Sequence, residues 1–321
     1  MKHLVAGLAL AFVLVGAGTS AHAQYPTKQI TLVVPFAAGG SNDIVARAIG
    51  KKLGEAWGQT VIVDNRAGAG GVIGAEFVAR AAPDGHTLLL VSSTYTINPA
   101  VKSHMPFDTL TAFEPVAFVA SSPLLMAAAN KLPVTSAREL IAIARAKPSS
   151  INYASAGPGS INQIAAELFA SAAGVKIVHV PYKGGALAIN DLVGGHVDLY
   201  ISSMPQILQI AKTGQARPLA VTGLKRSPSL PDIPTLDEIG LKGYEASSWW
   251  GIVAPAGVSA EIVTKLNAEI NRALGSDEMK RFLEGEGAEA TAMSPQAFRD
   301  LIEREVKRWD RVAKEANIRA D

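Results

Sequence analysis

The chemistry most readily proposed for this sequence is the binding of an anion by main-chain amides. The stretch VVPFAAGGSNDIVARAIG, residues 33–50, begins as an apolar strand and ends as a helix, with Gly39, Gly40 and Ser41 between them. Glycine lets the backbone approach a ligand, and the first amides of a helix have no partner inside it and attract anions. The stretch could equally be a plain strand-to-helix turn in which Ser41 or Asn42 caps the helix. This loop alone leaves both interpretations open.

A second stretch of the sequence repeats the same pattern. INYASAGPGSINQIAAELFASAAG, residues 151–174, contains a strand, a loop with Gly157 and Gly159, and a helix. Ser160 and Gln163 have the spacing of a capping box at the start of that helix. If the two loops belong to two facing lobes, both helix N-termini point into one cleft. Together they would form a clamp for an anion.

Hydroxyl groups and one cation follow two further strands. LLLVSSTYTINP carries Ser92, Ser93 and Thr94, and HVPYKGGALAINDL carries Lys183. Such hydroxyls and a single cation suit a small carboxylate. Two alternatives stay open, because Lys183 also fits a solvated turn and Asp43 also fits a first-turn acid that the helix dipole favours.

One further glycine segment imitates a dinucleotide-binding fingerprint. NRAGAGGVIGAE places Gly68, Gly70 and Gly74 between a strand and a helix. The last spacing is one residue too long, and Asp64 precedes the glycines, whereas a ribose-binding acid follows them by about 20 residues. We therefore assign this segment to close helix–sheet packing and expect no cofactor.

The sequence contains no pattern typical of catalysis or metal binding. The histidines outside the first 23 residues are scattered without metal-ligand spacing, and no serine lies in a G-x-S-x-G elbow. We expect no catalytic residues and no metal. A secreted α/β enzyme acting on a small carboxylate is the competing interpretation.

Short apolar runs alternate with helical patterns, which predicts an α/β fold with largely parallel sheets. The predicted strands are ITLVVPF, TVIVDN, HTLLLVSS, INYASA, KIVHVPY, VDLYISS, RPLAVTG and SWWGIVAP. The predicted helices include residues 42–57, 71–81, 137–146, 160–173, 186–194 and 260–274, and a charged terminal helix.

Two long extended runs do not fit a simple strand–helix repeat. They are FEPVAFVASSPLLMAAA and, about 125 residues later, YEASSWWGIVAPAG. A chain needs two such strands to cross into a second lobe and return, which places lobe boundaries near Ser122 and Ser248. The expected organisation is a signal segment at 1–23, lobe 1 at 24–122 and 249–321, and lobe 2 at 123–248. Adjacent Trp249 and Trp250 must point to opposite faces of the returning strand, so one packs in the core and the other is a candidate for the cleft.

The N-terminal segment and the composition indicate an exported protein. Lys2, an apolar run and Ala21-His22-Ala23 have the order of a secretory signal peptide cleaved near Ala23 and Gln24. The sequence has no cysteine, which excludes disulfides, so a large core must hold the fold. The formal net charge of +2, without a basic stripe interleaved with aromatics, argues against a nucleic-acid partner.

The chain resembles the periplasmic solute-binding proteins of tripartite tricarboxylate transporters, the Bug family. The stretches that carry the resemblance are, in order along the chain, YPTKQITLVVPFAAGGSNDIVAR, INYASAGPGS, HVPYKGGA and LAVTGLKRSPSLPDIPTLDEIG. The resemblance extends from Tyr25 to the C-terminus. It implies a two-lobe, Venus-flytrap fold, type II-like, with a hinge of two crossing strands. It also implies a monomer that binds a small carboxylate, di- or tricarboxylate or aromatic acid, for inner-membrane transporter subunits.

The resemblance and the motifs together define the expected ligand site. In relatives the two glycine loops hold a carboxylate, and here they correspond to residues 36–43 and 155–162. Gln163 and Ser202 stand where many relatives have His and Asp, which argues against pH-gated binding and an amino-acid ligand. The expected ligand-binding residues are Phe36, Gly39, Gly40, Ser41, Asp43, Ser92, Ser93, Ala156, Gly157, Gly159, Ser160, Asn162, Lys183, Ser202 and Trp249.

Overall fold

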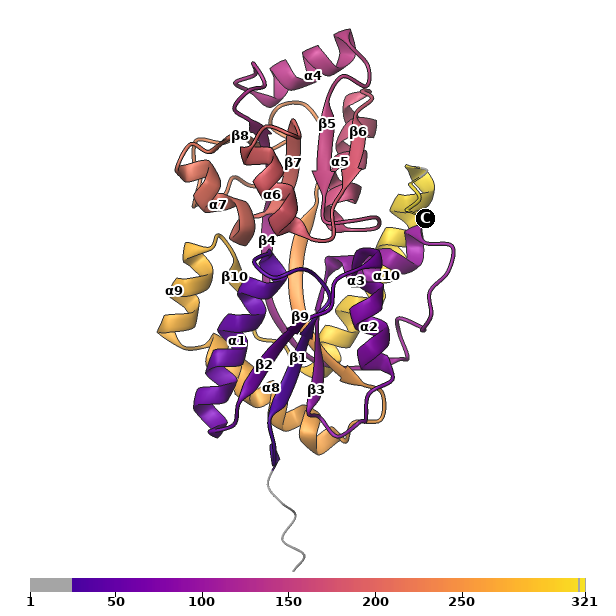
Figure 1. Ribbon diagram of the computed structural model, residues 1–321, viewed down its shortest axis with the longest axis vertical. Coiled ribbons are helices and arrows are strands. Elements are labelled where there is room, and N and C mark those ends of the chain that lie inside the picture. Colours follow the sequence, from indigo (N-terminus) through magenta and orange to yellow (C-terminus); the bar gives the residue numbers. More distant parts are fainter. Residues whose placement is uncertain (1–24, 317, 321) are drawn as a thin grey trace, which may run out of the picture.

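The computed structural model describes residues 25–316 and 318–320, and the signal segment predicted at 1–23 lies outside this range. The described chain forms two lobes, one above the other, joined by strands that run through the middle of the molecule (Figure 1). Within this described part, no helix is both long and apolar enough to cross a membrane.

Lobe 1 is built on a sheet whose main path has five strands, and the three strands at one edge of this path are parallel. The strand order is β2 (Val61–Asn65), β1 (Ile30–Val34), β3 (Thr87–Ser92), β9 (Ser247–Pro255) and β4 (Phe113–Ala129). β1 pairs in parallel with β2 and β3, whereas β9 is antiparallel to both β3 and β4. The remaining elements are α1 (Ser41–Trp57), η1 (Ala69–Gly71), α2 (Val72–Ala79), α3 (Ser93–Val101), α8 (Ala260–Leu274), α9 (Asp277–Gly285), β10 (Glu289–Ala290) and α10 (Pro295–Glu315).

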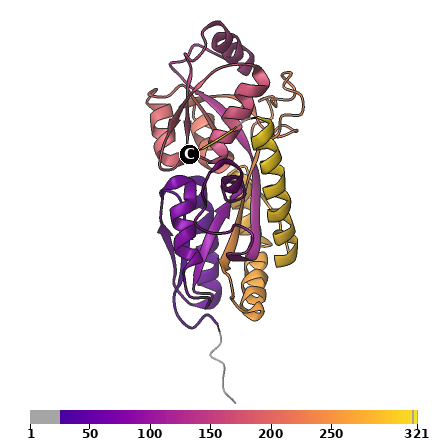
Figure 2. The ribbon, with the colours of Figure 1, turned by 90° about the vertical axis from the view of Figure 1, so that its right-hand side faces the viewer.

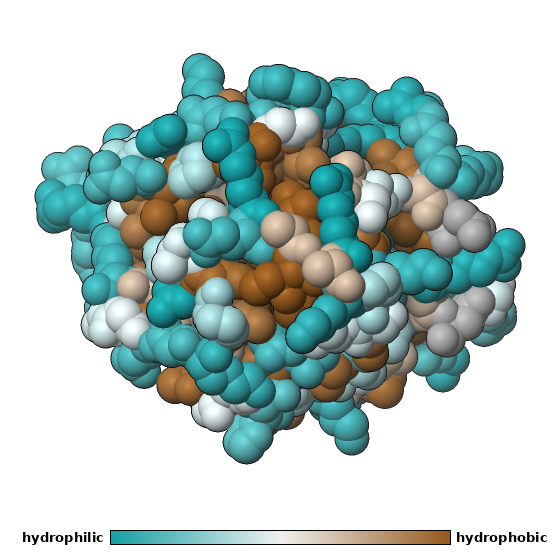
Figure 3. All heavy atoms as spheres, turned by 90° about the horizontal axis from the view of Figure 1, so that it is seen from above, coloured by the Kyte–Doolittle hydropathy of each residue, from teal (hydrophilic) through white to brown (hydrophobic). Residues whose placement is uncertain are grey.

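Lobe 2 repeats the strand–helix arrangement on a smaller sheet. β5 (Asn152–Ser155) is parallel to β6 (Val178–Pro181) and β7 (Leu199–Ser203), whereas β7 and β8 (Ala216–Val221) are antiparallel to the end of β4. Its helices are α4 (Ala137–Ala146), α5 (Ile161–Ala173), α6 (Gly185–Val193) and α7 (Met204–Lys212). At its far end, Leu140 of α4 is buried while Arg138 and Glu139 face solvent, and that end presents mainly hydrophilic side chains around smaller apolar patches (Figure 3).

The two long extended runs are β4 and β9, as predicted. β4 pairs with β9 along its first part and with β7 and β8 along its last part, so it passes from one sheet into the other. Next to this crossing, the Thr222 hydroxyl accepts a hydrogen bond from the Leu124 amide at 2.8 Å and lies 2.6 Å from the Ala246 carbonyl. The lobe boundaries near Ser122 and Ser248 stay a prediction.

The C-terminal helix α10 contacts both lobes. Phe298, near its start, packs with Phe118 and Trp249 in a core of lobe 1. Trp309, two-thirds of the way along, belongs to the core that also contains Phe169 of α5. Figure 2 shows α10 running upward beside both lobes. The sequence predicts this helix as part of lobe 1, but the helix also covers part of lobe 2.

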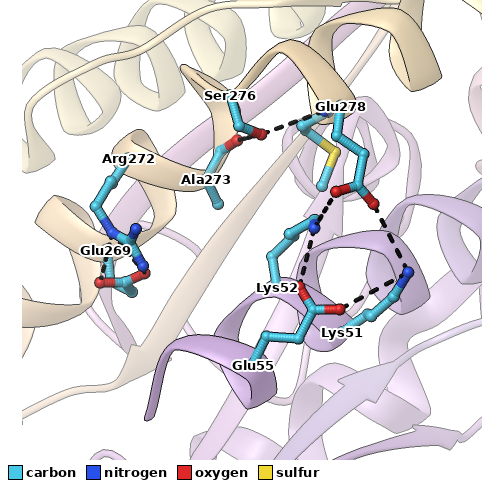
Figure 4. A network of polar contacts seen from close by, with 9 residues as sticks. Lys51, Lys52, Glu55, Glu269, Arg272, Ala273, Ser276 and Glu278 are labelled. Carbon is cyan, nitrogen blue, oxygen red and sulfur yellow. Dashed lines mark hydrogen bonds and ion pairs between the residues drawn. The ribbon is translucent and has the colours of Figure 1, made fainter.

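Helix α1 follows the first glycine loop and contacts neighbouring elements through an apolar face and a charged face. Val45, Ile49 and Leu53 are buried in the lobe 1 core at the spacing of a helical face. On its outer side, Lys52 of α1 forms ion pairs with Glu55 of the same helix and with Glu278 of α9 (Figure 4). Such exposed pairs contribute little to stability, so the apolar face positions the helix.

The α/β prediction is confirmed, whereas the expectation of largely parallel sheets holds only for the outer strands. Every pair that involves β4 or β9 is antiparallel, because these strands carry the chain between the lobes in opposite directions. Helix α3 was not predicted and takes the place of a loop after β3.

Candidate ligand-binding site

A pocket lies between the lobes, at the carboxyl end of β1. Both lobes contribute to its walls, and no lining residue carries a charged side chain. Its lining residues are Phe36, Gly40, Ser41, Asn42, Ser92, Thr94, Ala156, Ile161, Asn162, Gly185, Ser203, Gln206 and Ser248.

The N-terminus of α1 opens into this pocket without a cap. Gly40 is the N-cap residue, and no side chain accepts a hydrogen bond there. Among the described residues, the backbone amides of Ser41 and Asn42 have no acceptor. Neither Ser41 nor Asn42 caps the helix, so the arrangement assumed for a plain turn is absent. Uncapped amides at the positive end of a helix attract anions, and α1 presents such amides at the start of its 17 residues.

Asp43 holds the first loop in place from behind. Its carboxylate accepts hydrogen bonds from the Gly39 amide and from Arg47 Nε, both at 2.9 Å, and from Asn65 Nδ2 at 3.0 Å. Asn65 Nδ2 also reaches the Phe36 carbonyl at 3.1 Å. Burial opposes ionisation of Asp43, but the hydrogen bonds from Arg47, Gly39 and Asn65 outweigh it and hold its pKa below the usual value. Asp43 therefore braces the loop and does not line the pocket.

Asn42 lines the pocket; it lies within the predicted loop 36–43 but was not among the individually predicted ligand-binding residues. Its Oδ1 accepts a hydrogen bond from Trp250 Nε1 at 2.7 Å, which fixes the orientation of the amide group. The Nδ2 group is then the donor available to a ligand. Because the tryptophan lies on β9, far along the chain, no local pattern could have indicated this contact.

The second glycine loop uses most of its amides internally. The Gly157 amide donates to Ser155 Oγ at 3.0 Å, and the Gly159 amide donates to Gln163 Oε1 at 2.8 Å. Ser160 caps α5 by accepting from the Gln163 amide, as the capping-box spacing predicted. The amide of Ile161 donates across the cleft to Thr94 Oγ1 at 3.2 Å.

A second cavity, called the mouth below, lies between η1 and the second glycine loop. It shares Phe36 and Ala156 with the pocket, so the two spaces are adjacent. Lys183 is the one charged residue in its lining, which otherwise consists of Gly68, Ala69, Gly70, Gly71, Gly157, Pro158, Pro181 and Tyr182.

The structure brings some predicted site residues together and places others elsewhere. The pocket lining contains Phe36, Gly40, Ser41, Ser92, Ala156 and Asn162. The mouth contains Gly157 and Lys183. Outside both linings lie Gly39, Asp43, Ser93, Gly159, Ser160, Ser202 and Trp249.

Several of these outlying residues support the pocket walls. Ser93 Oγ accepts from the Trp249 amide at 2.9 Å and donates to the Ser247 carbonyl at 3.1 Å, which ties α3 to β9. Ser202 Oγ donates to Gln206 Oε1 at 3.2 Å. Gln206 Nε2, a buried donor at the pocket, has no acceptor among the described residues. No sequence pattern pointed to Gln206.

The two adjacent tryptophans point to opposite sides of β9, as predicted, but both are buried. Trp250 lies in one core cluster and Trp249 in another, between Phe118 and Phe298. Neither ring lines the pocket. The prediction that one of the two rings faces the cleft is therefore not met, because lobe 1 has an apolar layer on each side of its sheet and each ring packs into one of them.

Ser155 and His179 form a Ser–His pair of the kind found in catalytic sites, with a buried serine and a half-buried histidine. Ser155 Oγ lies 2.6 Å from His179 Nε2, and burial lowers the pKa of His179. Ser155 is fully buried and does not line the pocket. Among residues 25–316 and 318–320, no group of three or more His, Asp or Glu side chains could hold a metal ion.

The chain is similar to solved periplasmic binding proteins, two of which contain a bound carboxylate. Rpa4515 of R. palustris with adipate is 42% identical, with a TM-score of 0.89 over 92% of this chain and 99% of that chain. The periplasmic binding protein BugD is 35% identical, with a TM-score of 0.90 over 92% and 100%. MatC from Rhodopseudomonas palustris with bound malate is 32% identical, with a TM-score of 0.86 over 90% and 99%.

A family model supports the same relationship along most of the sequence. Residues 45–318 match the tripartite tricarboxylate transporter family receptor. The match includes α1 from Val45 onward, both crossing strands, the second glycine loop and α10, and it begins after the first glycine loop. The protein described here therefore belongs to the tripartite tricarboxylate transporter receptor family, whose members are two-lobe solute-binding proteins.

Proposed function

We propose that this protein captures a small carboxylate between its two lobes and performs no chemistry on it. The observation that carries this proposal is the uncapped N-terminus of α1, which opens into an interlobe pocket lined only by uncharged residues. Amides at a helix N-terminus bind one carboxylate through the helix dipole and through hydrogen bonds to a charged acceptor. The adipate and malate bound to related structures support the same ligand class.

In the proposed complex one carboxylate lies on the amides of Ser41 and Asn42. Asn42 Nδ2 and Gln206 Nε2 are further donors at the pocket wall. The remainder of the ligand extends past Phe36 into the mouth, where a second carboxylate would meet Lys183. Di- and tricarboxylates and aromatic acids are the candidates, because main-chain recognition of one carboxylate leaves the rest of the molecule to the shape of the cleft.

The proposed cellular role follows from the family and from the N-terminal sequence. Residues 1–23 are proposed to direct export to the periplasm, where the receptor works as a monomer. Its proposed partners are the inner-membrane subunits of a tripartite transporter, to which the closed, loaded receptor delivers its ligand. This role is supported by the description of the matching family and by the periplasmic relative BugD.

A thermal-shift screen of carboxylates on the purified mature protein tests the proposal. A ligand at about 100 times its Kd adds roughly 2.7 kcal/mol to the free energy of unfolding, which raises the Tm by a few degrees. Adipate and malate are the first compounds to test. If di-, tri- and aromatic carboxylates all leave the Tm unchanged, the proposal is wrong.

Charge recognition is tested by comparing a bound acid with its amide. Hydrogen bonds to a charged acceptor are worth about 1.5–3 kcal/mol, against about 1 kcal/mol for neutral groups. For each hydrogen bond this difference of about 0.5–2 kcal/mol corresponds to about two- to thirtyfold weaker binding of the amide in calorimetric titration. Equal affinities would contradict an anion site at α1.

The competing function is a secreted enzyme that acts on a small carboxylate, and the Ser155–His179 pair is the observation that favours it. Incubation of the protein with each ligand found in the screen, followed by product analysis, separates the two functions. If the protein converts a ligand to product and Ser155→Ala abolishes this conversion, the protein is an enzyme and the proposed receptor function is wrong. Unchanged ligand after prolonged incubation supports a receptor.

A further inference from the structure

Three contacts from lobe 1 converge on the second glycine loop of lobe 2. Thr94 Oγ1 accepts the hydrogen bond from the Ile161 amide at 3.2 Å. Asn98, on the next turn of α3, lies against Gly159, where an added Cβ would be 2.6 Å from its Oδ1. Gly70 of η1 lies against the Pro158 carbonyl oxygen. These contacts cross the mouth of the cleft, beside the pocket.

The Gly70 contact tolerates no side chain. A Cβ at this position would approach the Pro158 carbonyl oxygen more closely than the 3.0 Å that real Cβ contacts keep. The opposing atom belongs to the backbone, so it cannot rotate away. Gly70 is itself held in place, because Asn98 Nδ2 donates to its carbonyl oxygen at 3.0 Å. The two lobes can therefore approach to the observed distance only while residue 70 is glycine.

This contact changes the assignment of the segment that imitates a dinucleotide fingerprint. Close helix–sheet packing, as assigned from the sequence, fits Gly74, where a Cβ would lie 2.8 Å from Pro35 Cα. Gly70 faces the other lobe instead. We propose that Gly70 is a positioning residue, and that its contact with Pro158 acts as a latch that permits the lobes to close on the ligand.

The latch proposal adds a role for Gly70 to the proposed carboxylate binding, and it rests on that proposed function. Ala156 and Asn162 line the pocket from the second glycine loop, so they meet the ligand only when this loop is drawn against lobe 1. The apparent affinity of a receptor falls in proportion to the population of its binding-competent, closed form. A residue that blocks closure should weaken binding although it touches no ligand.

Gly70→Ala tests the latch, and two other glycines provide matched controls. Gly70 has a φ of 63°, and Gly58 in lobe 1 and Gly174 in lobe 2 each have a φ of 62°. A Cβ at Gly58 or Gly174 would meet nothing within 4 Å, so these variants carry the same left-handed strain without a new contact. With adipate as the probe, Gly70→Ala should bind at least about tenfold more weakly than wild type. Gly58→Ala and Gly174→Ala should stay within about twofold.

A disulfide-trapping experiment measures closure without any ligand. An ideal Cβ at Gly39 lies 3.6 Å from the Cβ of Ala186 across the cleft, within the range of a disulfide. The natural sequence has no cysteine, so Gly39→Cys with Ala186→Cys gives one possible cross-link. In this background, Gly70→Ala should slow cross-linking by at least about tenfold, whereas Gly58→Ala should not change it. The Tm of each variant separates global destabilisation from loss of closure.

The outcomes distinguish the latch from the proposed function. If no carboxylate binds the wild type but Gly70→Ala still slows cross-linking, the latch stands and the carboxylate function fails. If adipate binds the wild type and Gly70→Ala changes neither affinity nor cross-linking rate, the latch is overturned. Equal effects in Gly70→Ala and the two controls would also overturn it, because backbone strain would then explain the result.

Discussion

The two glycine loops share one design and differ at the N-cap of the helix that follows. Each follows a parallel strand, and each has a glycine amide that donates to the side chain four residues later, Gly39 to Asp43 and Gly159 to Gln163. The N-cap residue is Gly40 in the first loop and Ser160 in the second. Ser160 occupies an amide of its own helix, whereas Gly40 leaves the amides of α1 open to the pocket.

The difference suggests that one motif performs two tasks. The first loop leaves amides unpaired at the pocket, where we propose that an anion binds, while the second is internally bonded and contacts residues of lobe 1 such as Thr94. Sequence similarity between the loops therefore does not imply equal contacts with the ligand. Four substitutions, ordered by their expected effect on ligand affinity, test this comparison.

Gly40→Val should have the largest effect. Gly40 has a φ of −83°, so a side chain causes no backbone strain, but a branched one would fill the space over the α1 amides. We expect affinity for adipate to fall at least about 100-fold, or about 2.7 kcal/mol, in calorimetric titration. Gly285→Val is the control, because a Cβ there would meet nothing within 4 Å. Unchanged affinity in a folded Gly40→Val protein would mean that the first loop only turns the chain.

Asp43→Asn should have the next largest effect, because it removes the charge that braces the first loop. Losing charge-assisted bonds at a buried carboxylate should lower the free energy of unfolding by about 1–3 kcal/mol. The loosened loop should weaken adipate binding by roughly tenfold. Chemical denaturation and titration of the same sample measure both quantities. A variant with lower stability but wild-type affinity would show that the brace serves the fold alone.

The pH dependence of stability gives a further check on Asp43. Its pKa is lowered in the folded state, so its contribution to stability is fully present above the unfolded value of 3.8. This contribution is lost as the pH falls through the folded pKa. The difference in unfolding free energy between wild type and Asp43→Asn should therefore shrink below about pH 4. A difference that stays constant down to pH 2 would contradict the lowered pKa.

Gly40→Ser transfers the N-cap of the second loop to the first. The added hydroxyl can accept from an amide of α1, which should raise stability by a few tenths of a kcal/mol. The same hydroxyl competes with the ligand for those amides, so adipate should bind about three- to tenfold more weakly. Tighter binding would mean that the hydroxyl helps to hold the carboxylate, and the comparison of the loops would need revision.

Ser160→Ala should have the smallest effect on affinity. The sequence suggested Ser160 as a ligand contact, but its hydroxyl caps α5 and the residue is buried outside the pocket lining. Loss of the cap should cost about 1 kcal/mol of stability. Affinity should stay within about threefold of wild type. A loss of tenfold or more would restore Ser160 as a binding residue.

Local patterns predicted the elements well, because burial and propensity agree there. The bounds of α4 match the prediction, and β4 was recognised as one long extended run. Helix α3 was missed because SSTYTINPAV contains few strong helix formers and includes Pro99. Its burial against β9 and α10 decides its conformation, and a local sequence window contains neither partner.

The candidate site was only partly predictable, for a physical reason. Glycines and hydroxyls at strand ends indicated Gly40, Ser41 and Ser92. The roles of Asn42 and Gly70 depend on Trp250 and Pro158, which are distant in sequence. Side-chain type suggested Asp43 and Ser160 as ligand contacts, but their hydrogen bonds are used within the loops.

Helix α10 has a consequence for how the molecule unfolds. Its Trp309, Ala313 and the following Ile318 complete the apolar core of lobe 2, although the chain reaches them only after finishing lobe 1. A fragment of residues 123–248 would expose the surface that these side chains cover, and it would lose their burial energy. The two lobes therefore depend on one another for stability. Heating should melt them in a single cooperative transition, and deletion of the last turns of α10 should lower the melting temperature of both lobes together.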